Sequence, residues 1–156
     1  METMTNTKQQ HYSHKIGDEL AHFLADTYTL YLKTQNFHWN VVGPNFHSYH
    51  LLFEEQYKEL ADANDVIAER MRAVKSHVPA SFAHFMKLTS IKEENGTPGP
   101  KDMIKQLVKD NEIVTQHAYI ILSMAQKAHD EGTMDLMIER IRAHEKAAWM
   151  LRSHLE

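Results

Sequence analysis

The chain of 156 residues is 42% hydrophobic and carries a formal net charge of −4 at pH 7. This length fits a single domain over residues 1–156, and the negative charge argues against a basic nucleic-acid surface. The absence of cysteine excludes disulfides and thiolate metal sites. No stretch approaches the ~20 apolar residues of a membrane span, and the N-terminus lacks the apolar core of a signal peptide. We therefore expect a cytoplasmic protein that makes no membrane contact.

Apolar residues recur with a helical period along the first half of the chain. Residues 1–12 are polar, and we expect a flexible segment there, with Ser13 able to cap the first helix. A period near 3.6 predicts one helix over about residues 16–40 and a second over about residues 45–74. The Gly-Pro-Asn sequence at residues 43–45 predicts the turn between them, because Gly and Pro interrupt helices and Asn favours a helix start.

A long connection over residues 75–100 separates these helices from two more. Residues 81–88 within it predict a short helix. A third long helix begins near residue 101 and is interrupted at Gly132, and Thr133 caps a fourth. Four long helices with one long central connection are typical of a ferritin-like bundle. We therefore predict an all-α ferritin-like four-helix bundle with a short extra helix in the long crossover.

The chain contains two sets of possible metal ligands. The first set lies on either side of the turn at residues 43–45, and the second lies further along the predicted second helix. His38, His50 and Glu54 form the first set, and Asp65 and Glu69 form the second. His50 and Glu54 are four residues apart on one helix, so their side chains share a face. Asp65 and Glu69 repeat this spacing. Imidazole and carboxylate ligands suit iron, zinc or manganese and argue against copper(I) or a metal–sulfur cluster.

The distance between the two sets has a consequence for assembly. At ~1.5 Å rise per residue, Glu54 and Asp65 lie roughly 16 Å apart along the helix axis. No single ion can bind both sets on one helix. The sets meet only if a second copy of the helix runs antiparallel to the first, which a two-fold axis supplies. The spacing therefore predicts a metal site that two subunits share, formed twice per dimer.

These residues resemble the central motif of the Dps family, the DNA-binding proteins from starved cells, which are ferritin-like mini-ferritins. The matching positions are His38-Trp39, residues 43–46, His50, Glu54, Asp65 and residues 68–70, with weaker matches at residues 145–146 and 149–151. The resemblance covers nearly the whole chain. Some members carry Asp where this chain has Glu54, which is one methylene longer and still a carboxylate.

The resemblance implies a ferroxidase and iron-storage protein. Such a protein oxidises Fe(II) with hydrogen peroxide or oxygen and deposits ferric mineral in a hollow shell of twelve subunits, which protects DNA from oxidative damage. The implied iron ligands and catalytic residues at the dimer interface are His38, His50, Glu54, Asp65 and Glu69. Trp39 would lie beside the site and quench stray radicals, or simply pack at a helix end. The short helix at residues 81–88 would lie at the dimer interface.

The resemblance also suggests an entrance for iron. In Dps-like shells, the turn between the last two helices lines a three-fold pore for Fe(II), which here would involve Asp130, Asp135 and Glu139. Carboxylates are in any case favoured near a helix N-terminus by the helix dipole. Two interpretations of this acidic group therefore remain: it lines a pore for Fe(II), or it is ordinary charge at a helix N-terminus.

Two other functions compete with the ferroxidase. One is a nucleoid-compacting DNA-binding shell that protects DNA physically, and the other is a dinuclear metal oxidase in a small oligomer. An ordinary ferritin site within one bundle needs two Glu-x-x-His motifs. The chain has only Glu19 and His22, which we expect at the surface.

The terminal charges bear on the DNA-binding alternative. Salt-dependent DNA binding needs clustered Lys and Arg. Residues 1–12 contain one Lys and one Glu. We therefore expect weak or absent DNA binding at neutral pH. His11 and His14 leave a weak route to DNA open at acidic pH, because histidine is the side chain that gains charge there.

Overall fold

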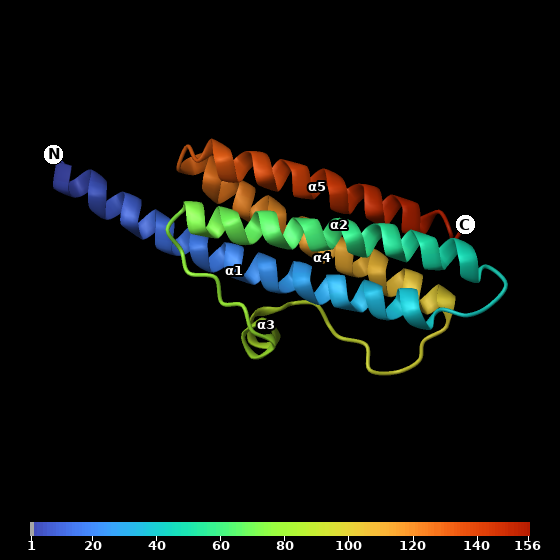
Figure 1. Cartoon of the computed structure of the whole chain (residues 1–156). Helices are drawn as coiled ribbons and strands as arrows, with labels where there is room; N and C mark the ends of the chain where they lie inside the picture. Colours follow the sequence, from blue (N-terminus) through green and yellow to red (C-terminus); the bar gives the residue numbers. More distant parts are fainter. Residues whose placement is uncertain (1) are drawn as a thin grey trace.

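Five helices make up the part of the chain that the computed structural model describes, which is the backbone of residues 2–156 and the side chains from residue 7 onward. The four long helices are α1 (Glu2–Asn40), α2 (Phe46–Ala73), α4 (Pro100–Lys127) and α5 (Glu131–Arg152). α1 packs against α2, and α4 packs against α5. The short helix α3 (Phe82–Leu88) lies against α1 in the crossover (Figure 1). The predicted four-helix bundle with a short extra helix is confirmed.

Local sequence signals account for where most helices begin and end. Gly43 adopts a φ of 118° in the turn between α1 and α2, a conformation that residues other than Gly rarely adopt. Ser81 caps α3 by accepting a hydrogen bond from the backbone N–H of His84. Pro100 occupies the first position of α4, where its missing N–H costs no helical hydrogen bond.

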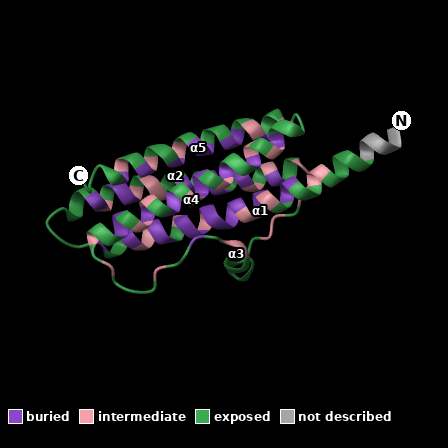
Figure 2. Cartoon of the chain, turned by 180° about the vertical axis from the view of Figure 1, so that it is seen from behind, coloured by how far each residue is buried: buried purple, intermediate pink, exposed green. Residues whose placement is uncertain are grey.

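The core lies where the apolar faces of the four long helices meet (Figure 2). Phe23 and Phe37 of α1 are fully buried there, with Phe53 of α2. α4 and α5 contribute five more buried side chains, those of Ile104, Leu107, Ile121, Met137 and Leu151. These positions follow the predicted helical period, because a helix that buries one face needs an apolar residue every three or four positions.

The start of α1 differs from the expected one. α1 begins at Glu2, so the helix includes the segment that we expected to be flexible, and Ser13 is not its cap. No Gly or Pro occurs before Gly17, so nothing in residues 2–16 interrupts the helix. This N-terminal segment projects beyond the end of the other helices (Figure 1).

The start of α5 also differs from the expected one. α4 ends at Lys127, and His129 adopts a left-handed φ of 56° in the turn. The cap of α5 is Asp130, not Thr133, because its carboxylate accepts a hydrogen bond from the backbone N–H of Thr133. Gly132 lies inside the first turn of α5, where a Cβ atom would come within 2.7 Å of the Arg70 guanidinium. Gly132 thus lies inside the helix, against the end of the Arg70 side chain, and does not mark the break between the two helices.

Candidate metal centre

The turn between α1 and α2 places His38 against His50. His38 lies in the last turn of α1 and is buried, and His50 lies near the start of α2 and is half-buried. The two imidazole rings stack with their centroids 3.8 Å apart. Nδ1 of His38 lies 2.7 Å from the backbone carbonyl of His50, and Nδ1 of His50 lies 2.7 Å from the carbonyl of His38.

These reciprocal hydrogen bonds select one tautomer for each of the two rings. A carbonyl oxygen only accepts, so Nδ1 of each ring must carry the proton and donate. In this tautomer, Nε2 of each ring carries the lone pair that can bind a metal ion. Metal-binding histidines commonly donate their second ring nitrogen in this way, which fixes both the tautomer and the orientation of the ring. His38 and His50 therefore fit the role of metal ligands.

Glu54 lies one turn beyond His50 on the same face of α2. Its carboxylate forms an ion pair of 2.8 Å with Lys58, and its side chain is 33% exposed. The hydrogen bond from the Lys58 ammonium, together with the charge of that group, holds the pKa of Glu54 below its ordinary value. Glu54 is therefore a ready anionic ligand, although Lys58 competes with any cation for it.

Asp65 and Glu69 lie further along α2 and are exposed. Among the described residues of one chain, no three His, Asp or Glu side chains converge on a point that could hold a metal ion. The structure therefore joins His38 to His50 and keeps Asp65 and Glu69 away from them. The ligand assignments of all five residues remain predictions.

Three exposed apolar side chains lie close in sequence to the two histidines. Trp39 is 62% exposed, and Val42 and Phe46 are also exposed. The ring of Phe46 stacks on His50 with a centroid distance of 5.0 Å. At least one of these apolar side chains, Phe46, therefore covers part of the His50 ring.

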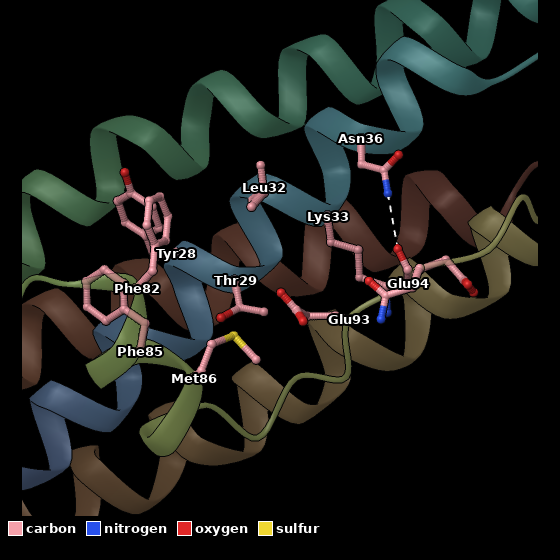
Figure 3. A pocket seen from close by; sticks show the side chains of 11 residues that line it. Tyr28, Thr29, Leu32, Lys33, Asn36, Phe82, Phe85, Met86, Glu93 and Glu94 are labelled. Carbon is pink, nitrogen blue, oxygen red and sulfur yellow. Dashed lines mark hydrogen bonds between the residues drawn. The ribbon is translucent and has the colours of Figure 1, made fainter.

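A second apolar surface lies where α1 faces α3. It is a groove of about 280 Å³ whose lining includes Tyr28, Leu32, Phe82, Phe85 and Met86 (Figure 3). Phe82 is 71% exposed. This groove is on the crossover side of the molecule, at the helix that we predicted to lie at a dimer interface.

Glu19 and His22 are not the free surface residues that we expected. Both are half-buried. Glu19 contacts Nε2 of His117 at 3.0 Å, and Nδ1 of the same ring lies 3.3 Å from the buried carboxylate of Asp26. His22 directs Nδ1 at the backbone carbonyl of Leu88 at 3.0 Å. No local spacing predicts these contacts of His117, because its partners are 91 and 98 residues away.

Asp130 has internal partners, which bears on its predicted place in a pore. Its carboxylate accepts hydrogen bonds from Tyr12, Arg70 and Thr133, and its side chain is 12% exposed. Burial alone would raise its pKa, but the hydrogen bonds from Thr133 and Tyr12 and the charge of Arg70 hold the pKa of Asp130 below its ordinary value. Both oxygens therefore bind the protein itself.

Asp135 and Glu139 are exposed on α5. Together with Glu69 of α2, they line a shallow groove of about 380 Å³. This acidic surface is more accessible to a cation than Asp130 is.

Comparison with known proteins agrees with the fold. The ferritin-like domain family matches residues 17–156. The crystal structure of a Dps protein from Vibrio cholerae, described as a member of a broad superfamily of ferritin-like diiron-carboxylate proteins, superposes with a TM-score of 0.90 at 33% identity. It covers 93% of this chain, and this chain covers 91% of it. The four long helices and α3 thus form a ferritin-like bundle.

Individual relatives show which family within the ferritin-like superfamily this chain belongs to. A DNA protection during starvation protein from Brevibacillus brevis is 37% identical over 134 residues, which are 85% of this chain and 89% of the relative. The protein of the same name from Helicobacter pylori is 34% identical over 142 residues, which are 90% of this chain and 99% of the relative. The chain belongs to the Dps family within the ferritin-like superfamily. None of the described helices is long and apolar enough to cross a membrane.

Proposed function

We propose that this protein is a ferroxidase that stores iron. Fe(II) is the substrate, and it binds between two subunits to His38, His50 and Glu54 of one chain and to Asp65 and Glu69 of the other. The observation that carries this proposal is the reciprocal pair of hydrogen bonds between His38 and His50, each 2.7 Å long. They leave the Nε2 lone pairs of two adjacent stacked rings available to a metal ion.

The need for a second chain supports the shared site. His38, His50 and Glu54 provide two neutral nitrogens and one carboxylate, which leaves a divalent cation incompletely neutralised. Asp65 and Glu69 supply the missing charge only from another copy, because they lie further along the same helix. Carboxylate ligands also favour the ferric product, whose higher charge binds hard anionic oxygen more strongly.

The proposed reaction is the oxidation of two Fe(II) by one hydrogen peroxide and two protons, which yields two Fe(III) and two water molecules. Oxygen is the alternative oxidant. The ferric product collects as mineral inside a hollow shell of twelve subunits. The protein then protects DNA by removing iron and peroxide. Its net charge of −4 per chain opposes direct DNA binding at neutral pH. We place this activity in the cytoplasm.

We further propose that Fe(II) reaches the shell interior past Asp135 and Glu139. These carboxylates are exposed, whereas Asp130 is occupied by Arg70 and Tyr12. The role of Asp130 in a pore is therefore indirect: it fixes the turn from which α5 begins.

The direct test is anaerobic addition of Fe(II) followed by hydrogen peroxide. Ferric absorbance and particle size are followed together. The proposal expects rapid ferric absorbance that requires peroxide or oxygen, and a soluble particle whose mass grows by the added iron. His38→Ala with His50→Ala should abolish the fast phase, whereas the exposed control His47→Ala should keep it. Equal rates in both variants would contradict the proposal.

A further inference from the structure

Three tyrosine rings lead away from the candidate metal centre. The ring of Tyr57 makes an edge contact with the His38 imidazole, with a centroid distance of 5.1 Å. Tyr57 then meets Tyr31 of α1 at 6.1 Å, and Tyr31 meets Tyr28 at 5.6 Å. We call Tyr57, Tyr31 and Tyr28 the tyrosine file.

Helix geometry explains why the file is continuous. Tyr28 and Tyr31 are three residues apart on α1, so their rings lie on the same face. Tyr57 is three residues beyond Glu54 on α2, so it faces the same side as this candidate ligand. The contact between α1 and α2 then joins the two segments.

The far end of the file is enclosed by phenylalanine. Tyr28 stacks on Phe85 of α3 at 4.9 Å and meets Phe82 at 6.4 Å (Figure 3). A phenylalanine ring is much harder to oxidise than a phenol. An electron vacancy that reaches Tyr28 therefore stops there, at the groove between α1 and α3.

All three tyrosines are half-buried. Partial burial separates the rings from bulk oxidants and still leaves a path for the phenolic proton to water. Both features matter, because oxidation of a phenol near neutral pH releases its proton together with the electron.

We propose that the tyrosine file supplies the second electron when peroxide meets a single Fe(II) at the site. This inference rests on the proposed ferroxidase function. Hydrogen peroxide needs two electrons to become two water molecules, and one Fe(II) gives only one. Without a second donor, the O–O bond breaks to hydroxide and a free hydroxyl radical.

The electron and atom balance closes in two steps. In the first, one Fe(II), one hydrogen peroxide, the Tyr57 phenol and one proton from solvent give Fe(III), two water molecules and the Tyr57 phenoxyl radical. The O–O bond breaks, and the phenolic O–H supplies one electron and one proton. Tyr31 then passes an electron and a proton to Tyr57, and Tyr28 passes them to Tyr31.

In the second step the file is restored. The next Fe(II) to bind gives its electron back through Tyr57, and the phenoxyl oxygen takes one proton from solvent. The sum is two Fe(II), one peroxide and two protons to two Fe(III) and two water molecules. The file thus stores one oxidising equivalent between two iron-binding events.

The first experiment adds one Fe(II) per site and then peroxide, with freeze-quenched electron paramagnetic resonance and a spin trap. Wild-type protein should show a tyrosyl radical that a second equivalent of Fe(II) removes. Tyr57→Phe should lose this radical and release several-fold more trapped hydroxyl radical. Tyr31→Phe should confine the radical to Tyr57. The off-file control Tyr119→Phe, on α4 and 48% exposed in the wild type, should behave like the wild type.

The second experiment needs no iron. The chain contains no cysteine, so Trp39→Cys creates a unique attachment point for a ruthenium photo-oxidant next to His38 and also removes a competing indole. A light flash with an electron-accepting quencher should produce a tyrosyl radical whose lifetime falls several-fold when Tyr31→Phe is added. Adding Tyr119→Phe should leave the lifetime unchanged.

The two experiments separate the two proposals. Absent ferric absorbance in the first experiment, with file-dependent radicals in the second, would overturn the ferroxidase and with it the stated role of the file. Normal ferric absorbance with the same radical yield in wild type, Tyr57→Phe and Tyr31→Phe would overturn the file alone. A purely structural role for these rings would alter thermal stability and leave the radical signals unchanged.

Discussion

The ion pair between Glu54 and Lys58 sets a testable limit on metal affinity. Lys58→Ala removes the cation that competes for the Glu54 carboxylate. We expect Fe(II) to bind several-fold more tightly, because the ligand no longer has to leave an ammonium partner. Anaerobic calorimetry measures this affinity. Lys58→Arg keeps the positive charge and should stay close to the wild type. Weaker binding in Lys58→Ala would show that Lys58 helps to position the site.

The carboxylate of Asp130 stabilises the turn between α4 and α5. Asp130→Asn should lower the free energy of unfolding by about 1 kcal/mol, since it weakens a helix cap and removes the negative charge that pairs with Arg70. Urea unfolding at pH 7 measures the loss. The control Asp135→Asn changes an exposed side chain that caps nothing and should stay within error of the wild type.

The pH dependence of this loss follows from the lowered pKa of Asp130. A carboxyl group with a folded pKa below its unfolded value contributes stability above the ordinary Asp value near 3.8. That contribution disappears as pH falls through the folded pKa. The wild type and Asp130→Asn should therefore converge in stability at strongly acidic pH. A constant difference across the whole range would contradict this assignment.

At the level of elements, His117 connects α4 to α1 and to the crossover. Asp26 accepts from both Thr89 and Ser90 of the crossover, and it also contacts His117. Burial alone would lower the pKa of His117, but the hydrogen bonds and charges of Asp26 and Glu19 raise it above 6.5. His117 thus ties α4 to α1 directly and to the crossover through Asp26, and protonation of its ring strengthens these contacts.

His117→Gln should destabilise the fold in a pH-dependent way. A raised pKa contributes stability that is fully present below the unfolded value near 6.5 and is lost as pH rises through the folded pKa. We expect a loss of about 2 kcal/mol at pH 6 and a smaller loss at pH 9. Urea unfolding at both values measures it, with the exposed His47→Gln as control. A larger loss at pH 9 than at pH 6 would contradict the account.

Helices α1 and α4 show which features of the fold can be predicted from sequence and which cannot. The turn after α1 and the start of α4 follow from Gly43 and Pro100, whose backbone preferences act locally. The partners of His117 depend on tertiary packing of α1 against α4, and no local spacing encodes that contact. The early start of α1 was missed because polar residues gave no apolar face to follow, although no residue there interrupts a helix.

Some features of the candidate metal centre can likewise be predicted from sequence, and others cannot. The four-residue spacing of His50 and Glu54 predicts a shared face on α2, and the structure places both there. The stacking of His38 on His50 arises from the geometry of the turn, which the sequence indicates without giving a distance. The completion of the site by a second chain stays a prediction from the separation along α2.

At the level of the whole molecule, the acidic groove on α5 predicts a route for iron. Asp135→Asn with Glu139→Gln should slow iron uptake several-fold at low ionic strength, because exposed carboxylates raise the local concentration of cations. High salt should reduce the difference by screening. Stopped-flow ferric absorbance measures the rate, and light scattering confirms the assembly. Unchanged uptake at low ionic strength would contradict this route.

The shared site is the central claim, and mixed assemblies test it most directly. One parent chain carries His38→Ala and His50→Ala, and the other carries Asp65→Ala and Glu69→Ala. Each parent alone should be inactive. In a mixed dimer, one site lacks all four ligands and the other is intact. Random mixing should therefore restore roughly a quarter of the wild-type sites. Ferric absorbance at that level, in co-assembled protein verified by two different tags, is the predicted result. A co-assembled protein as inactive as both parents would contradict the shared site.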